Sequence, residues 1–301
     1  TTDLTITTAN ADSAFGVVAA AVTDLSVGGS NDLDLSVGST LTNLETVTVT
    51  GSAGLEIDLT GLLNQTSVDT TGTTGDSKVT MDGTLATFTG GAGSDEVILT
   101  VANPTKAISL GEGDDFLELA AGTATAAAGL DGGAGTDMLI MSATDAATAS
   151  GSVIFEGQFT GFEELALTSG AGNVNLANMN DISTVAFGGM LGAVNLTNVA
   201  DAASLEFYTN ATVSAALAAD TAADSMSVPI QDDDHASATE NENALTINLD
   251  LDAVAPPTDS GIENLTVESS DLFGSTGAGA ALLEEGEFDT HTLNLTDADL
   301  E

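Results

Sequence analysis

Three aspartates follow clusters of glycine at a nearly constant spacing, and no other residues of the chain suggest chemistry as clearly. Asp95 lies in Gly90–Ile98, Asp115 in Leu110–Glu118 and Asp137 in Gly132–Ile140. The first and third segments match G-G-x-G-x-D-x-U-x at every position, where U is a large apolar residue, and the second lacks only the first glycine. Calcium prefers about six to eight oxygen ligands, mixing carboxylates with backbone carbonyls. The segments therefore predict calcium-binding turns.

The composition of these turns explains how they would hold an ion. Glycine permits positive φ, which turns successive carbonyls toward one point, and the Asp supplies an anionic ligand. The apolar residue two places later points into the core. One turn offers only half a coordination sphere, so the ion must lie between stacked turns. The step from Asp95 to Asp115 and the step from Asp115 to Asp137 are nearly equal, which places the turns on the same side of consecutive coils.

The elements that position these turns are short runs of alternating hydrophobicity, which are typical of strands. Examples are Glu45–Thr50, Leu55–Leu59, Val97–Val101, Phe116–Leu119 and Leu245–Leu251. One pattern recurs at a constant interval in Phe162–Leu167, Ile182–Phe187 and Ala202–Phe207. This period predicts an all-β, right-handed parallel β-helix or β-roll, a solenoid with coils of about 20 residues. Independent antiparallel sandwiches also have short, evenly spaced strands, but they would not repeat one motif at constant phase.

Shifts in composition divide the chain into four expected regions. Residues 1–75 form an N-terminal β-strand repeat region, and 76–210 a β-solenoid with calcium-binding turns at 90–140. Residues 211–258 are acidic and alanine-rich and are expected to be an insertion or linker, followed by a C-terminal β-module over 259–301. Gly75-Asp76-Ser77 is interpreted as a degenerate turn, and Ala14–Val22 as a short helix or a buried strand. The chain starts at Thr1 and ends in mid-pattern, so we expect it to be part of something longer.

The chain is extremely acidic, which excludes several classes of binding partner. It has 46 acidic residues against two lysines, for a net charge of −44. Such a chain repels nucleic acid and anionic lipid headgroups, and its longest apolar run is too short to cross a membrane. Because 42% of residues are hydrophobic, a buried core is still expected. Without cysteine there is no disulfide framework, which favours a bacterial secreted protein stabilised by metal.

Several other polar groups have plainer interpretations than a functional site. Asp232-Asp233-Asp234-His235 resembles a metal cluster but lacks turn glycines, so a solvated acidic loop is expected, and His291 is expected on a strand surface. Glu163 and Glu164 are neighbours whose side chains point to opposite faces of a strand, so they cannot flank one glycosidic bond, and a structural or solvent-facing role is expected. Asn195, Asn264 and Asn294 begin formal glycosylation sequons, which we interpret as a record of the repeat.

The turn motif resembles that of the RTX family of calcium-binding repeat proteins, which are secreted through type I systems. The resemblance covers residues 90–140. It implies that Asp95 and Asp115 share one calcium ion and that Asp115 and Asp137 share a second. The implied carbonyl donors are Gly91, Gly93, Gly111, Gly113, Gly133 and Gly135. The usual RTX repeats carry calcium-binding turns on both sides of the coil, whereas this chain carries them on one side. In this it looks more like RTX-type bacterial surface-layer proteins or giant adhesins.

Together these features predict a non-enzymatic, calcium-binding structural protein that is secreted or held at the bacterial cell surface. Calcium would drive its folding, and copies would associate into a layer or filament through strand edges or calcium-bridged acidic faces. One alternative is an adhesin stalk or carbohydrate-binding module that contacts cell-surface polysaccharide. Another is the calcium-roll portion of an RTX enzyme, although the sequence carries no hydrolase motif.

Overall fold

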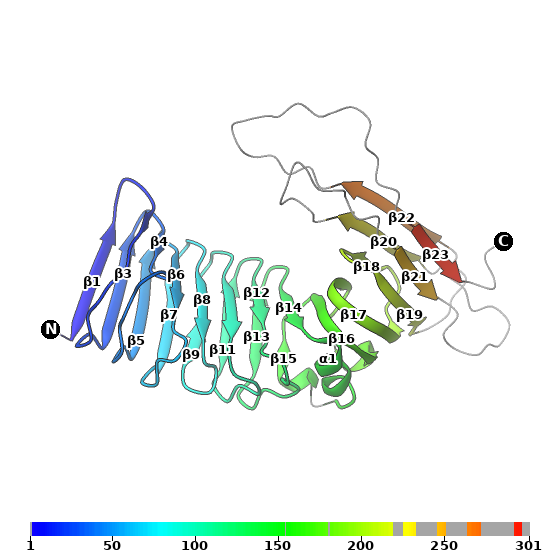
Figure 1. Ribbon diagram of the computed structural model, residues 1–301, viewed down its shortest axis with the longest axis horizontal. Coiled ribbons are helices and arrows are strands. Elements are labelled where there is room, and N and C mark those ends of the chain that lie inside the picture. Colours follow the sequence, from blue (N-terminus) through cyan, green and yellow to red (C-terminus); the bar gives the residue numbers. More distant parts are fainter. Residues whose placement is uncertain are drawn as a thin grey trace, which may run out of the picture. The chain divides into compact units, whose positions relative to one another are not determined.

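The computed structural model describes residues 2–153, 155–179, 181–218, 225–232, 246–250, 264–271 and 292–296. They belong to two compact units. The first contains Thr1–Met141, Thr148–Leu165 and Asn178–Ile182, and the second contains Ser142–Ala147, Ala166–Ala177 and Ser183–Glu301. Both are built of parallel strands stacked coil upon coil, so the predicted parallel β-solenoid is confirmed (Figure 1).

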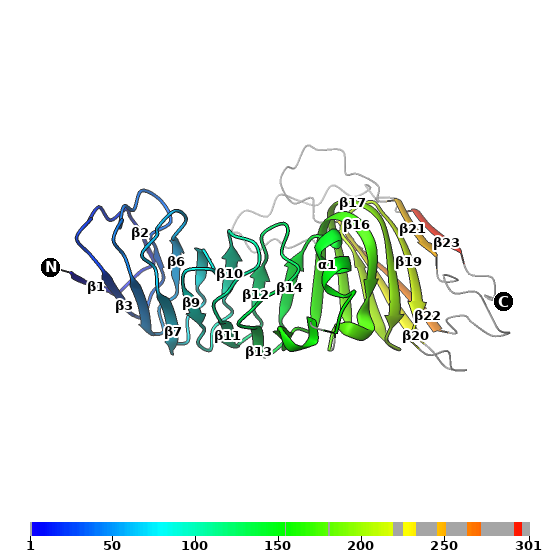
Figure 2. The same cartoon turned by 90° about the horizontal axis from the view of Figure 1, so that it is seen from below.

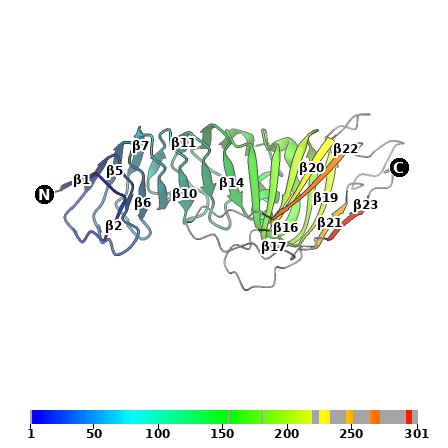
Figure 3. The ribbon, with the colours of Figure 1, turned by 90° about the horizontal axis from the view of Figure 1, so that it is seen from above.

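Each coil of the first unit contributes one strand to each of two sheets. The first sheet contains, in spatial order, β1 (Asp3–Thr8), β3 (Asp24–Gly29), β5 (Thr46–Gly51), β7 (Ser67–Thr73), β9 (Thr87–Thr89), β11 (Ile108–Glu112), β13 (Leu130–Ala134) and β15 (Phe159–Thr160). The second contains β2 (Ser13–Ala14), β4 (Leu33–Asp34), β6 (Leu55–Asp58), β8 (Lys78–Met81), β10 (Glu96–Leu99), β12 (Phe116–Glu118) and β14 (Met138–Met141). Figure 3 shows the odd-numbered strands of this unit on one face and the even-numbered strands on the other.

The strand register gives the length of each coil directly. Asp24 pairs with Thr46 in the first sheet, an offset of 22 along the chain. In the second sheet Lys78 pairs with Glu96, an offset of 18. Glu96 then pairs with Phe116, directly after the step of 20 from Asp95 to Asp115. The predicted coil length therefore holds for these coils, whereas the offset between β13 and β15, where Asp131 pairs with Thr160, is 29.

The core of the first unit lies between its two sheets, whose strands Figure 2 shows stacked along the unit. In the first sheet the register aligns Leu25, Val47, Val68, Phe88, Ile108, Leu130 and Phe159. In the second it aligns Ile57, Val79, Val97, Leu117 and Leu139. All of these side chains are buried, and burying one of this size contributes about 1.5–3 kcal/mol. Apart from Phe88 and Phe159, these buried side chains are branched aliphatics.

The second unit is also built of parallel strands, and its last coils are longer than those of the first unit. Its strands are β17 (Thr184–Val199), β18 (Ala203–Phe207), β19 (Ala211–Leu217), β20 (Ser225–Asp232), β21 (Thr246–Asp250), β22 (Asn264–Asp271) and β23 (Thr292–Thr296), and all the pairs among them are parallel. The first half of β17 pairs with β18 and its second half with β19. Phe187 stacks on Phe207 with ring centroids 4.8 Å apart.

Two segments differ from expectation. The range 211–258, expected to be an insertion or linker, contains β19, β20 and β21, which pair with other strands of the second unit in one sheet. The interpretation of Ala14–Val22 as a helix or buried strand is wrong, because only Ala14 belongs to a strand. Phe15 and Val18 are 46% and 79% exposed. A Cβ at Gly16 would stand 2.7 Å from the Gly38 carbonyl oxygen, so this run is a loop stacked closely on the next coil.

Helical structure is scarce in the described residues. The α-helix α1 (Ala143–Ala149) begins after Ser142, whose Oγ accepts the Asp145 N–H at 3.1 Å and so caps the first turn. Two short 3₁₀ segments, η1 (Phe155–Gly157) and η2 (Leu176–Asn178), complete the set, and β16 (Glu164–Asn175) has residues in both units. Among the described residues, no helix has the length and hydropathy needed to cross a membrane.

Candidate metal centre

The three glycine turns stack on one corner of consecutive coils in the first unit. They connect β9 to β10, β11 to β12 and β13 to β14, and each Asp is the residue directly before the second strand of its pair. Since β10, β12 and β14 are aligned in register, Asp95, Asp115 and Asp137 form a column. The placement inferred from their nearly constant spacing therefore matches the structure.

The column is held together by its own carboxylates. All three side chains are 0% exposed. The backbone N–H of Asp95 donates to Asp115 Oδ1 at 2.6 Å, and the N–H of Asp115 donates to Asp137 Oδ1 at 2.9 Å. Each carboxylate thus reaches back to the equivalent residue of the preceding coil, which links successive coils through a charge-assisted hydrogen bond.

Residues outside the three motifs hydrogen-bond to both ends of the column. At the N-terminal end the N–H of Ser77 donates to Asp95 Oδ1 at 2.9 Å, so the degenerate turn occupies the expected register. Thr70 Oγ1 donates to Asp95 Oδ2 at 3.1 Å. At the C-terminal end the Asp137 N–H donates to Glu163 Oε2 at 3.0 Å. We refer to Asp95, Asp115, Asp137 and Glu163 as the carboxylate column.

Two oxygens of this column are buried without a hydrogen-bond partner. They are Oδ2 of Asp115 and Oδ2 of Asp137, and a buried, unpartnered carboxylate oxygen is strongly unfavourable. Burial raises the pKa of Asp115 to about 7. The hydrogen bond from the Asp95 N–H lowers this pKa, and the negative charges of neighbouring aspartates raise it further. Burial likewise raises the pKa of Asp137 to about 6, with Glu163 as the largest repelling charge. At neutral pH the column therefore favours a proton or a cation.

The glycines fit a metal-binding turn because they bring successive backbones into contact. Gly111 and Gly133 both have φ +111°, a conformation that other residues rarely adopt. A Cβ at Gly111 would overlap the carbonyl oxygen of Gly91, and a Cβ at Gly133 would overlap that of Gly111. The carbonyls of one turn therefore face the backbone of the next. The Gly91 carbonyl accepts the Glu112 N–H at 2.8 Å, which leaves it a second lone pair.

The remaining predicted donors lie in the same stack. Gly113 and Gly135 have φ values of +132° and +145°, and a Cβ on either would overlap a carbonyl oxygen of the preceding turn, that of Gly93 for Gly113 and that of Gly113 for Gly135. Gly93 packs in turn on the backbone of Gly75. Within the described part of the chain, no group of three or more acidic, His or Cys side chains is placed to hold a metal ion. An ion at this corner would therefore take much of its coordination from these carbonyls.

A second set of carboxylates, absent from the sequence prediction, lies one residue before the column. Asp76 Oδ1 accepts the Ser94 N–H and Asp114 Oδ1 accepts the Thr136 N–H, both at 2.8 Å. Asp32 Oδ1 accepts from Gly54 at 2.7 Å in an earlier coil. These carboxylates reach forward to the next coil, whereas those of the column reach back. Part of the acidic excess is thus used to satisfy backbone donors at the corner.

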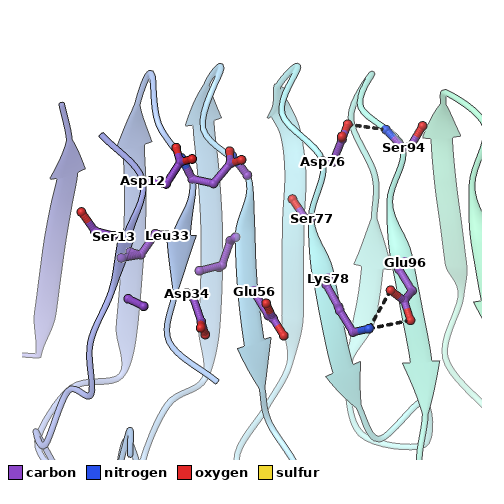
Figure 4. Close-up of a pocket in the computed structure, with 14 residues that line it drawn as sticks. Asp12, Ser13, Leu33, Asp34, Glu56, Asp76, Ser77, Lys78, Ser94 and Glu96 are labelled. Atoms are coloured by element: carbon purple, nitrogen blue, oxygen red, sulfur yellow. Dashed lines mark hydrogen bonds and ion pairs between the residues drawn. The ribbon is translucent and has the colours of Figure 1, made fainter. Parts of the chain in front are cut away.

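An acidic groove of about 410 Å³ lies along the N-terminal strands of the second sheet (Figure 4). Figure 4 shows Asp34, Glu56, Lys78 and Glu96 in a row across neighbouring strands. Lys78 Nζ lies 2.8 Å from Glu96 Oε2, with the side chains 44% and 38% exposed. An ion pair this exposed contributes at most about 1 kcal/mol. The groove therefore carries more negative charge than its lysine neutralises.

The other polar candidates are accounted for as follows. Asp233, Asp234, His235 and His291 lie outside the described residues. Asn195 donates to Asn173 Oδ1 at 2.6 Å and Asn294 to Asn248 Oδ1 at 2.8 Å. These side-chain amides thus pair between coils, in line with the interpretation of the sequons as a record of the repeat.

Comparison of the chain with protein-family models and with curated proteins finds no match. The resemblance to RTX proteins therefore rests on the turn motif and its spacing.

Proposed function

We propose that this protein is an extracellular structural solenoid of the RTX type whose folding is coupled to calcium binding, with a structural rather than catalytic role. The observation that carries the proposal is the buried Oδ2 of Asp115, which has no partner in a stack of glycine turns. Its neighbours along the column are carboxylates, and no lysine approaches them among the salt bridges of the described residues. A divalent cation supplies the missing charge.

The principal ion would lie between the second and third turns. Asp115 and Asp137 would hold it with their carboxylates, together with carbonyls of the surrounding glycines. When bound, calcium supplies positive charge and cross-links two coils. The RTX resemblance also implies an ion between Asp95 and Asp115, but both oxygens of Asp95 already accept hydrogen bonds. We therefore assign the stronger binding to the Asp115–Asp137 interface.

The free energy of calcium binding would stabilise the folded state of this chain. With a net charge of −44, collapse brings carboxylates together, and the three buried aspartates resist ionisation in the folded state. Ligands that must be ionised and gathered bind metal only as the structure forms. Removing calcium therefore lowers the free energy of unfolding, and millimolar calcium raises it.

The test is calcium titration of the chelated protein, followed by far-ultraviolet circular dichroism and equilibrium dialysis. We expect β-structure to rise together with bound calcium, and equal concentrations of magnesium to be far less effective, because Mg²⁺ requires a stricter octahedral geometry. Full β-structure in chelator with no bound calcium at saturation would refute the proposal.

We further propose that copies associate through calcium-bridged acidic faces, forming a layer or filament at the bacterial surface. The row of Asp34, Glu56 and Glu96 beside one lysine is such a face in the first unit. Light scattering in rising calcium should detect growth beyond the monomer. A particle that folds yet stays monomeric at millimolar calcium would favour the stalk or binding-module alternative.

A further inference from the structure

We infer that the coil after the third turn completes an additional calcium site, built from Asp137, Gly161 and Glu163, although it carries no copy of the motif. This inference rests on the proposed calcium-dependent function and adds residues to it. Calcium binding by the unmodified protein tests the proposed function, and calcium binding by Glu163 variants tests the additional site.

The strand register places a shortened turn against the third motif. Leu130 pairs with Phe159 and Asp131 with Thr160, so Gly161 is aligned with Gly132. Glu163 occupies the position of Asp137 in the next coil. The N–H of Glu164 donates to the Asp137 carbonyl at 3.1 Å, as the N–H of Met138 donates to the Asp115 carbonyl, and the residue before each of these donors is the acid. Gly161-Phe162-Glu163 thus replaces the longer segment Gly132–Asp137 and keeps the two positions that carry a carbonyl and a carboxylate.

Two oxygens converge in front of the Gly132 Cα. A Cβ at Gly132 would overlap the Gly161 carbonyl oxygen and would stand 2.8 Å from Asp137 Oδ2. Both oxygens therefore lie near one point, within the span that a cation bridges with ligands at about 2.4 Å. Asp137 is 0% exposed and this Oδ2 has no partner, so a buried, unsatisfied acceptor lies near the Gly161 carbonyl oxygen.

The first turn has the same geometry and a different outcome. A Cβ at Gly90 would overlap the Leu110 carbonyl oxygen and would stand 3.0 Å from Asp95 Oδ2. There, however, Thr70 Oγ1 satisfies Asp95 Oδ2 with a hydrogen bond of 3.1 Å. The column is thus closed by a hydroxyl at its N-terminal end, and an acceptor remains open at its C-terminal end.

Glu163 provides the anionic ligand on the far side of this interface. Its Oε2 accepts the Asp137 N–H at 3.0 Å, so the carboxylate is fixed beside Asp137. The longer side chain of glutamate compensates for the shorter turn. Phe162 is buried and anchors that turn, and Asp131, held by Thr160 Oγ1 at 3.0 Å, adds a nearby charge. Carboxylates gathered around an open acceptor in this way attract a divalent cation.

The decisive experiment compares Glu163→Gln with Glu164→Gln by equilibrium dialysis and calorimetric titration with calcium. The amide introduced by Glu163→Gln would keep an oxygen that accepts the Asp137 N–H, so the fold should survive, as circular dichroism in millimolar calcium would verify. We expect Glu163→Gln to lose one bound ion, or to weaken that ion at least tenfold, and Glu164→Gln to bind as the unmodified protein does.

A second substitution keeps the test decisive. Glu163→Asp retains the charge but is shorter by one methylene group, so it should weaken the same ion. Unchanged stoichiometry and affinity in Glu163→Gln, or full affinity in Glu163→Asp, would overturn the inference while leaving the proposed function standing if the unmodified protein binds calcium. Absence of calcium binding by the unmodified protein would instead remove both.

Discussion

Replacing Asp115 with asparagine should change stability in opposite directions with and without calcium. Asparagine has the same shape and keeps an oxygen that accepts the Asp95 N–H. It removes the charge of a side chain that is fully buried and whose second oxygen has no partner. Without calcium this removes an unfavourable ionisation, and with calcium it removes a ligand.

The magnitude follows from the pKa of Asp115, which burial raises from 3.8 to about 7. Since one pKa unit corresponds to 1.36 kcal/mol, ionising this group in the folded protein at pH 8 costs up to roughly 4 kcal/mol. Relaxation of the turn lowers that ceiling, so Asp115→Asn should stabilise the calcium-free protein by about 1–3 kcal/mol. Mutating a residue that only supports a metal ligand typically lowers metal affinity ~10- to 100-fold. Because Asp115 would be a ligand itself, Asp115→Asn should lower calcium affinity by at least that factor.

The assay is urea unfolding at pH 8, followed by circular dichroism, in chelator and in millimolar calcium. Asp58→Asn is the matched control, because Asp58 is an exposed residue of β6 whose replacement removes the same charge from the surface. It should shift the midpoint little in either condition. If Asp115→Asn destabilised the protein in chelator as well, the carboxylate would be favourable without metal, and the reasoning from burial would be refuted.

Three further outcomes are expected. In chelator the free energy of unfolding should rise as pH falls from about 8 to 4, because folded-state carboxyl pKa values of about 7 and 6 mean that the folded protein binds more protons; a flat or inverse profile would contradict this. Gly133→Ala should destabilise the solenoid in thermal melts, because φ is +111° and a Cβ would overlap a carbonyl, whereas Gly157→Ala, with nothing within 4 Å, should not. Leu117→Ala should cost about 2–5 kcal/mol in urea unfolding, and Leu63→Ala, at 78% exposure, much less; equal effects would argue against the core assignment.

The fold and the stacking of the three turns could be predicted because each depends on local pattern. Alternation fixes which side chains point inward, and a constant period brings equivalent residues together. Asp95, Asp115 and Asp137 therefore had to form a column once a constant coil length was assumed. The hydrogen bonds between these carboxylates and the preceding backbone required coordinates, since they depend on side-chain direction.

What escaped prediction lies where the period changes. The step from Asp137 to Glu163 is 26, against 20 and 22 for the two steps before it. Glu163 also sits in a shortened turn and is glutamate, so no motif search finds it; the remaining signal is a glycine two residues before the acid, as at Gly135 and Asp137. The strands within 211–258 do not follow the period of 20, because a coil there is longer: Ala211 pairs with Ile247, and the offset is 36. Without that period, the acidic, alanine-rich composition of this range is the remaining signal, and it predicts a linker.

The opposed directions of the two carboxylate sets bear on how such a chain can lengthen. Asp115 reaches back to the coil before it, while Asp114, in the same coil, reaches forward to the coil after it. On each of its two faces, such a coil presents one carboxylate acceptor and one backbone N–H donor. The donor on one face matches the acceptor on the opposite face of an identical coil. Duplication of that segment therefore inserts a unit that fits its own copy, with donors and acceptors matched at every new junction. Growth by whole-repeat gene duplication is compatible with this corner, whereas insertion of part of a coil would leave orphaned groups.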